Sequence, residues 1–255
     1  MEYSLFATQN TIEEMGSALL IDLNYLTKFV VLIGFLKCCK EYHIKITDYV
    51  SNVITYQHKD IRFVDIINHK SGLEYTSNHN ILHKQFLNSS NLHRFSTSLK
   101  KNMEAMGNYY YNNYGYNILT YTIYSLTGLQ IDEYLETNLL SKIDYTWDKI
   151  KNIPIAGYGL QIYKKDIRQF LFNIRDEMHL YNFNFYYDKF KLPIKNFKET
   201  ALFFGHSGKT GSYFYYSKKI DCLYVYIQSM GYYNLTETNY KDILLKKLYY
   251  LNDTI

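Results

Sequence analysis

One charged residue, Lys28, lies at the start of the most apolar stretch of the chain. Residues 29–36 (Phe-Val-Val-Leu-Ile-Gly-Phe-Leu) are apolar on every side of a helical wheel, which is typical of a helix in the middle of a protein. A lysine at the mouth of such a helix costs free energy unless its ammonium is partnered or used. We therefore expect Lys28 to belong to a functional site. The alternative is a lysine whose ammonium reaches back to solvent along its aliphatic stem.

Three further segments place polar side chains next to glycine. Residues 66–73 have the sequence Ile-Ile-Asn-His-Lys-Ser-Gly-Leu, and residues 111–116 have the sequence Tyr-Asn-Asn-Tyr-Gly-Tyr. Near the end of the chain, residues 205–211 have the sequence Gly-His-Ser-Gly-Lys-Thr-Gly. Together with the segment around Lys28 they form an ordered set of four motifs.

Taken in order, these segments resemble the motifs of the serine β-lactamases and penicillin-binding-protein-like serine hydrolases, the class C type in particular. The stretch Tyr25–Lys28 with its apolar helix is similar to the Ser-x-x-Lys helix of that family. Residues 66–73 are similar to its Leu-Leu-x-His-x-Ser-Gly-Leu segment, residues 111–113 to its Tyr-x-Asn motif, and residues 205–211 to its His-Thr-Gly or Lys-Thr-Gly strand. The resemblance extends over residues 20–235.

The resemblance implies a fold of the α/β class and the α+β type, like that of β-lactamases and transpeptidases. An antiparallel sheet is expected to be flanked by helices and joined to a helical region. Because residues 1–20 leave little room for strands before the central helix, we expect the N-terminal strands to be trimmed. No Pro-rich or Gly-rich linker divides the chain, so we predict a single domain over residues 1–255.

The resemblance also implies a site for acyl transfer. In the family a serine attacks the substrate, and the lysine three residues later, here Lys28, takes the serine proton. Tyr111 is expected to act beside it in proton transfer, and Asn113 to bind the substrate amide. The following strand is expected to pair with the substrate and to help form the oxyanion hole. Its three matching residues are His206, Ser207 and Gly208.

The nucleophile position holds Tyr25 where the family has serine. A phenol, with an ordinary pKa near 10, is a conceivable nucleophile if Lys28 helps to ionise it. Its oxygen, however, projects further from the backbone than a serine oxygen, into the space of the substrate carbonyl, and acyl transfer tolerates such misplacement badly. Ser17, Ser71 and Ser207 do not replace it, since the first lies too far before Lys28 and the others match structural or substrate-binding positions. We therefore predict a blocked or severely weakened site.

Three interpretations of the function follow. We favour a catalytically impaired member of the family, a pseudoenzyme that retains a ligand-binding cleft. The main rival is a working amide or ester hydrolase, with Tyr25 as an unusual nucleophile or with Lys28 and Tyr111 activating water. The third is a tyrosine-rich interaction module. Structural roles also stay open, since Tyr111 and Asn113 suit a turn and a helix cap, and His69 suits a hydrogen-bonded structural histidine.

The remaining pattern predicts the elements that hold these residues. The sequence predicts helices at residues 24–41, 61–68, 116–128, around 131–139, 166–172 and 239–251. The third, fourth and sixth keep apolar positions at helical spacing, whereas the first contains a continuous apolar run for which a strand is the alternative. Gly72 and Gly128 are expected to end the second and third of these helices. Aromatic and β-branched runs predict strands at residues 3–7, 213–216 and 222–228. The last two strands are predicted to form a hairpin that presents Leu223, Val225 and Ile227 on one face.

Composition narrows the functional classes. The chain of 255 residues is 47% hydrophobic and 20% charged, as in globular proteins. Its 30 tyrosines suit either an AT-rich coding sequence or a stacking surface for nucleic acid. A net charge of +4 without a dense Lys/Arg stripe argues against nucleic acid. The three cysteines and eight histidines show no disulfide or metal spacing, so we expect neither a metal nor an organic cofactor.

The N-terminus does not have the form of a signal peptide, because Glu2, Glu13 and Glu14 stand where a basic start and an apolar run are expected. The apolar run after Lys28 is also too short for a membrane span, which needs about 20 residues. We therefore predict a cytoplasmic protein without a membrane span. Its expected partner is a small-molecule or peptide ligand, and the sequence leaves the oligomeric state open.

Overall fold

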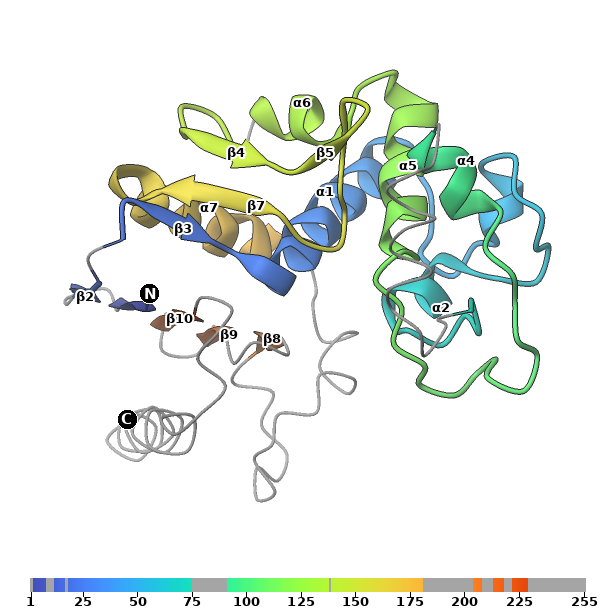
Figure 1. Cartoon of the computed structure of the whole chain (residues 1–255), viewed down its shortest axis with the longest axis horizontal. Helices are drawn as coiled ribbons and strands as arrows, with labels where there is room; N and C mark the ends of the chain where they lie inside the picture. Colours follow the sequence, from blue (N-terminus) through green and yellow to red (C-terminus); the bar gives the residue numbers. More distant parts are fainter. Residues whose placement is uncertain are drawn as a thin grey trace. The chain divides into compact units, whose positions relative to one another are not determined.

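Two segments that are distant in the sequence, residues 1–26 and 162–255, form one unit of the computed structural model, and residues 27–161 form the other. Figure 1 shows the helices and strands in chain order. The structure describes residues 2–7, 12–16, 18–74, 91–137, 139–180, 204–207, 213–217 and 222–228. The predicted helix at 239–251 lies outside these residues.

The sheet of the first unit pairs N-terminal strands with the C-terminal hairpin. Its strand order is β2-β1-β10-β9-β8, and each neighbouring pair is antiparallel. The strands are β1 (Glu2–Ala7), β2 (Ile12–Met15), β8 (Phe204–Ser207), β9 (Tyr213–Ser217) and β10 (Cys222–Gln228). The predicted hairpin is confirmed, and Leu223, Val225 and Ile227 are all buried, as expected for alternate residues of one face.

Three further elements belong to the first unit. They are β3 (Leu20–Asp22), the 3-10 helix η1 (Asn24–Leu26) and α7 (Lys164–Leu180). α7 contacts β3, and the Lys164 amide donates to the Leu19 carbonyl at 2.8 Å. The helix is longer than the predicted 166–172. Its apolar residues keep helical spacing well past the predicted end, and the buried ones are Ile167, Phe170, Leu171 and Ile174.

The central helix of the second unit is α1 (Thr27–Glu41), and every residue from Thr27 to Phe35 is buried. The predicted helix is confirmed, and a strand in this position is excluded. α1 packs against α5 (Tyr116–Thr127) and α6 (Ile131–Glu136) (Figure 1). Gly34 permits the approach of α6, because a Cβ at this position would lie 2.9 Å from Ile131 Cδ1.

The second unit also contains several short elements. They are η2 (Val50–Asn52), α2 (Phe63–Ile67), α4 (Leu92–Thr97), β4 (Tyr145–Trp147), β5 (Lys149–Ile150), β6 (Ile153–Pro154) and β7 (Leu160–Tyr163), which crosses from the second unit into the first. β5 and β6 form a small antiparallel pair. α5 ends as predicted at Gly128, whose φ of 77° is left-handed.

The end of α2 differs from the prediction that Gly72 caps this helix. The left-handed residue directly after the helix is His69, with φ 54°. The His69 amide donates to the Ile66 carbonyl at 3.0 Å, and the Lys70 amide donates to the Asp65 carbonyl at 2.7 Å. This is the Schellman pattern of a helix C-terminus. Gly72 has a positive φ as well, but it serves the turn that follows.

Candidate functional site

Lys28 is completely buried in the first turn of α1. Its Nζ donates to the Gly157 carbonyl at 2.8 Å and lies 5.2 Å from the centroid of the Tyr111 ring. Burial disfavours the charged ammonium, and it lowers the pKa of Lys28 well below its ordinary value. Lys28 thus does not reach back to solvent. It is an amine held inside the protein next to a carbonyl and an aromatic face.

Tyr111 and Asn113 lie beside this amine. The Tyr111 hydroxyl donates to Asn113 Oδ1 at 2.7 Å, which leaves the Nδ2 group of Asn113 with the N–H donors of the amide. Asn113 also lies against Gly157, because a Cβ at Gly157 would be only 3.2 Å from the Asn113 carbonyl oxygen. The structure therefore brings Lys28, Tyr111 and Asn113 together around Gly157.

Asn112, between these two residues, fixes the backbone that carries them. Its Oδ1 accepts hydrogen bonds from the amides of Tyr114 at 2.7 Å and Gly115 at 3.1 Å, just before α5 begins. Its Nδ2 donates to the carbonyls of Leu73 at 3.0 Å and Glu74 at 3.1 Å. The capping role that suited Tyr111 and Asn113 from the sequence is thus performed by Asn112.

His69 supports the same backbone from the other side. Its Nδ1 accepts the Asn112 amide at 3.2 Å, and its carbonyl accepts the Tyr110 amide at 2.7 Å. Its ring also packs on the Tyr111 ring, with centroids 4.5 Å apart. A nitrogen that accepts a backbone N–H carries no proton of its own, so the proton of the neutral ring is on Nε2. In this geometry His69 has a structural, hydrogen-bonded role.

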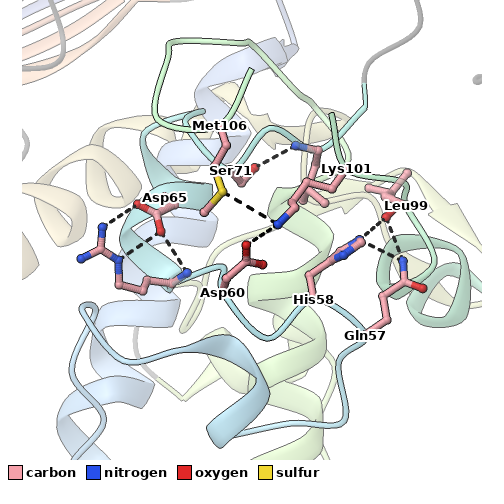
Figure 2. A network of polar contacts seen from close by, with 10 residues as sticks. Gln57, His58, Asp60, Asp65, Ser71, Leu99, Lys101 and Met106 are labelled. Carbon is pink, nitrogen blue, oxygen red and sulfur yellow. Dashed lines mark hydrogen bonds and ion pairs between the residues drawn. The ribbon is translucent and has the colours of Figure 1, made fainter. Parts of the chain in front are cut away.

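The loop that leads into Tyr111 is held by a separate polar network (Figure 2). Gln57 Nε2 donates to the Leu99 carbonyl at 2.9 Å, and His58 Nε2 lies 2.7 Å from the same oxygen. The Lys101 ammonium forms an ion pair with the Asp60 carboxylate, and its Nζ atom lies 3.8 Å from Met106 Sδ. These contacts join residues 57–60 to residues 99–106, and so they hold the loop that precedes Tyr111.

Sequence reasoning missed Gly157 and the segment before it. The Ile155 amide donates to the Asp148 carbonyl at 2.9 Å, and the Ile155 carbonyl accepts Trp147 Nε1 at 3.0 Å. The Ala156 amide donates to Asn117 Oδ1 at 3.0 Å. A backbone carbonyl has no side-chain signature, and the available signal was the closely spaced pair Gly157 and Gly159, which is typical of close backbone approach.

The other predicted site residues belong to the first unit. The backbone of Tyr25 lies in η1, three residues before Lys28 in the chain. His206 and Ser207 are the last two residues of β8, and β8 contacts η1 within this unit. Strand β8 thus lies next to the segment that contains the backbone of Tyr25. Gly208 lies outside the described residues.

The described residues also contain free cysteines and side chains of the metal-ligating types. Burial raises the pKa of the Cys38 thiol to about 12, with the Glu41 carboxylate acting in the same direction, so this thiol is unreactive at neutral pH. The described residues include no cluster of three His, Cys, Asp or Glu side chains that suits a metal ion. Across the same residues, no helix is both long and apolar enough to cross a membrane.

Comparison with solved structures identifies the fold. The chain is similar to FmtA from Staphylococcus aureus, with a TM-score of 0.64, 15% identity, and coverage of 95% of this chain and 84% of FmtA. It is similar to a penicillin-binding protein from Bacillus halodurans, with a TM-score of 0.63 and 12% identity. The match covers 88% of this chain and 90% of that protein. It is also similar to a β-lactamase from Mycobacterium bovis, with a TM-score of 0.55 and 15% identity. The match covers 89% of this chain and 86% of that β-lactamase.

At the level of sequence, neither a protein-family model nor a curated protein matches the chain. The similarity of the backbone extends over most of this chain and most of each structure compared. It agrees with the predicted antiparallel sheet flanked by helices and with the helical region that contains α1 and α5. The chain has the fold of the penicillin-binding proteins and β-lactamases.

Proposed function

We propose that this protein is a β-lactamase-related member of the serine hydrolase family that retains the ligand-binding side chains of an acyl-transfer site and lacks an efficient nucleophile. One observation carries the proposal. Lys28, Tyr111 and Asn113 lie together around Gly157, while the residue three positions before Lys28 is Tyr25. Fold alone does not define chemistry, so the proposal rests on these side chains.

The retained side chains suit a ligand that contains an amide or ester carbonyl. Asn113 directs Oδ1 to the Tyr111 hydroxyl, and its Nδ2 group is therefore the natural donor to a ligand carbonyl. Lys28 and Tyr111 provide groups that exchange protons close to that position. We accordingly infer a small molecule or a short peptide as the ligand, and we assign Lys28, Tyr111 and Asn113 to its binding.

Tyr25 is the reason to expect impaired acyl transfer. An acyl-transfer site aligns its oxyanion hole with a short nucleophile, and the reacting atoms must approach to about 3–3.5 Å. A tyrosine oxygen lies beyond an aromatic ring and misses this alignment. The resemblance assigns the oxyanion side to His206, Ser207 and Gly208.

Intact-protein mass spectrometry tests the proposal. The natural protein, Tyr25→Ser and Tyr25→Ala are incubated separately with a fluorophosphonate and with a reactive β-lactam. We expect an adduct on Tyr25→Ser alone, because it restores a short hydroxyl at the position that Lys28 serves. Tyr25→Ala is the matched control, since it opens the same space without a nucleophile. An adduct on Tyr25→Ala equal to that on Tyr25→Ser, or no adduct on Tyr25→Ser, contradicts the proposal.

The second candidate is a working amide or ester hydrolase. The observation that favours it is the lowered pKa of Lys28, which results from burial and increases the fraction of neutral amine able to accept a proton. The proton donor would be the Tyr25 phenol or a water held with Tyr111. An adduct on the natural protein that peptide mapping assigns to Tyr25 would favour this candidate over the impaired one.

A further inference from the structure

The acceptor of the Lys28 amine belongs to a short segment whose three residues are each held by a different partner. The Ile155 amide donates a hydrogen bond to the Asp148 carbonyl, and the Ile155 carbonyl accepts one from Trp147 Nε1. Ala156, which is fully buried, is bonded through its amide to the side chain of Asn117. Gly157 then presents its carbonyl to Lys28 Nζ. The position of this carbonyl therefore depends on the bond made one residue earlier.

Asn117 is well suited to control that position. Its side chain is fully buried on α5, and its Oδ1 accepts the Ala156 amide at 3.0 Å. The orientation of the side-chain amide is fixed, because the reverse orientation would place two donors against each other. Among the described residues, Asn117 Nδ2 has no hydrogen-bond partner. A buried amide with one unsatisfied donor costs free energy, so packing alone does not account for an asparagine here.

We propose that Asn117 is a positioning residue, which holds the Ala156–Gly157 segment so that the Gly157 carbonyl stays in hydrogen-bond contact with the amine of Lys28. Asn117 acts through the backbone and does not itself contact the ligand. The proposal rests on the proposed function for its biological meaning, since it assigns to Asn117 the control of the amine in that site. The effect of Asn117 on the pKa of Lys28 is measured separately from any reaction.

The sign of the effect follows from the chemistry of the bond. A carbonyl oxygen stabilises an ammonium more than a neutral amine, because a hydrogen bond to a charged donor is the stronger one. The Gly157 carbonyl therefore opposes the effect of burial on Lys28. Without Asn117 the Ala156 amide loses its acceptor, the Gly157 carbonyl is no longer held at the amine, and Lys28 gives up its proton at a lower pH.

The test is a pH titration of the natural protein labelled with carbon-13 in its lysines, in which the Cε resonance of Lys28 is followed by NMR and assigned with Lys28→Met. The variants are Asn117→Leu, which has a similar volume without an acceptor, and Asn117→Asp, which keeps an acceptor for the Ala156 amide. We expect the midpoint of Lys28 to fall by about one pH unit in Asn117→Leu and not to fall in Asn117→Asp.

An unchanged midpoint in Asn117→Leu overturns the proposal, as does an equal fall in Asn117→Asp. If the leucine variant does not fold, Asn117→Ala gives the same comparison without added bulk. The readout does not require any reaction. A shifted midpoint combined with no adduct on Tyr25→Ser would therefore refute the proposed function and leave the role of Asn117 standing, while the reverse combination would refute only the role of Asn117.

Discussion

At the scale of the residue, the protein contains ionisable side chains in places that water does not reach. Lys28 is the clearest case, because its amine is fully buried and is bonded to a backbone carbonyl. His93 is a second case, 6% exposed on α4. Its ring is stacked between two tyrosines of α5, with centroids 4.8 Å from Tyr121 and 5.2 Å from Tyr124. Each buried group makes the folded state sensitive to pH.

His93 gives a prediction with a defined sign. Burial lowers the pKa of His93 to about 4. In the unfolded chain a histidine has a pKa near 6.5. As the pH falls from about 6.5 to about 4, the unfolded state takes up a proton that the folded state does not, so the free energy of unfolding decreases, by roughly 1 to 3 kcal/mol.

Urea denaturation at pH 7.5 and at pH 4.5 measures this difference. His93→Phe is the matched control, since it keeps an aromatic ring between Tyr121 and Tyr124 and cannot take up a proton. The decrease in the free energy of unfolding should be smaller in His93→Phe than in the natural protein. An equal decrease in both proteins would show that other groups cause the acid sensitivity and that His93 is not held neutral.

The sequence predicts only some of the residues around Lys28. Lys28, Tyr111 and Asn113 were identifiable because side chains of these types at this spacing match known motifs. Asn112 and Asn117 were not, because their effect is to hold backbone amides and carbonyls, and their partners depend on the tertiary fold. In a chain with many asparagines, nothing local distinguishes these two from asparagines at the surface.

At the scale of the element, turns and helix ends bring the motifs together. The turn after α2 supplies the carbonyl of Gly72, which accepts the Asn102 amide at 2.8 Å. The neighbouring Glu74 amide donates to the Lys100 carbonyl at 2.7 Å. Residues 69–74 therefore form a backbone platform for the loop that ends at Tyr111. Holding this loop accounts for His69 and Gly72 in the motif at residues 66–73 without a role in catalysis.

Two glycines of this region provide a matched pair of variants. Gly72 and Gly107 both have a positive φ, at 66° and 81°. A Cβ at Gly72 would lie 2.6 Å from the Asn102 carbonyl oxygen, whereas a Cβ at Gly107 would meet nothing within 4 Å. Gly107→Ala should lower the free energy of unfolding only by the backbone strain, about 1 kcal/mol. Gly72→Ala should cost about 2 to 4 kcal/mol, because steric overlap with backbone is added.

Chemical denaturation of the two variants measures these costs. Gly72→Ala should have the lower midpoint, with an unchanged dependence on denaturant concentration. If the two variants are equally stable, the close approach of residues 72 and 102 is not present in solution, and the platform described for residues 69–74 is wrong.

Local pattern predicts elements better than it predicts their ends. α1 was predictable from its continuous apolar run after Lys28, and α5 from apolar residues at helical spacing and the stop at Gly128. The residue that follows α2 was predicted wrongly, since glycine is the usual left-handed residue and the protein uses His69. The conformational strain of a left-handed histidine is offset by the hydrogen bonds that His69 accepts from the amides of Tyr110 and Asn112. Because these partners are distant in the sequence, local pattern does not predict them.

At the scale of the whole molecule, the chain passes between its two units without a separate linker. η1 is followed directly by α1, and β7 begins in one unit and ends in the other. The pairing of β1 with β10 joins residues at opposite ends of the sequence. No local pattern predicts which strands pair across such a distance, whereas the hairpin β9–β10 is local and was predicted.

These connections lead us to predict that the protein unfolds as a single domain, in one cooperative step. The only tryptophan of the chain, Trp147, is buried in the second unit and reports on it by fluorescence. Hydrogen exchange of the β10 amides reports on the first unit. In a urea titration the two probes should give the same midpoint. Separate midpoints would show that the two units are independent domains.

The measurement that tests the central claim most directly is the rate of fluorophosphonate adduct formation by Tyr25→Ser, with and without the further change Lys28→Met. Methionine fills a similar volume and removes the amine, and it leaves the Gly157 carbonyl without the Lys28 donor, so only variants that remain folded are compared. If Lys28 serves the position of Tyr25, its loss should slow the adduct at least 100-fold, as expected when a proton acceptor is removed. Equal rates in the two variants would contradict the account.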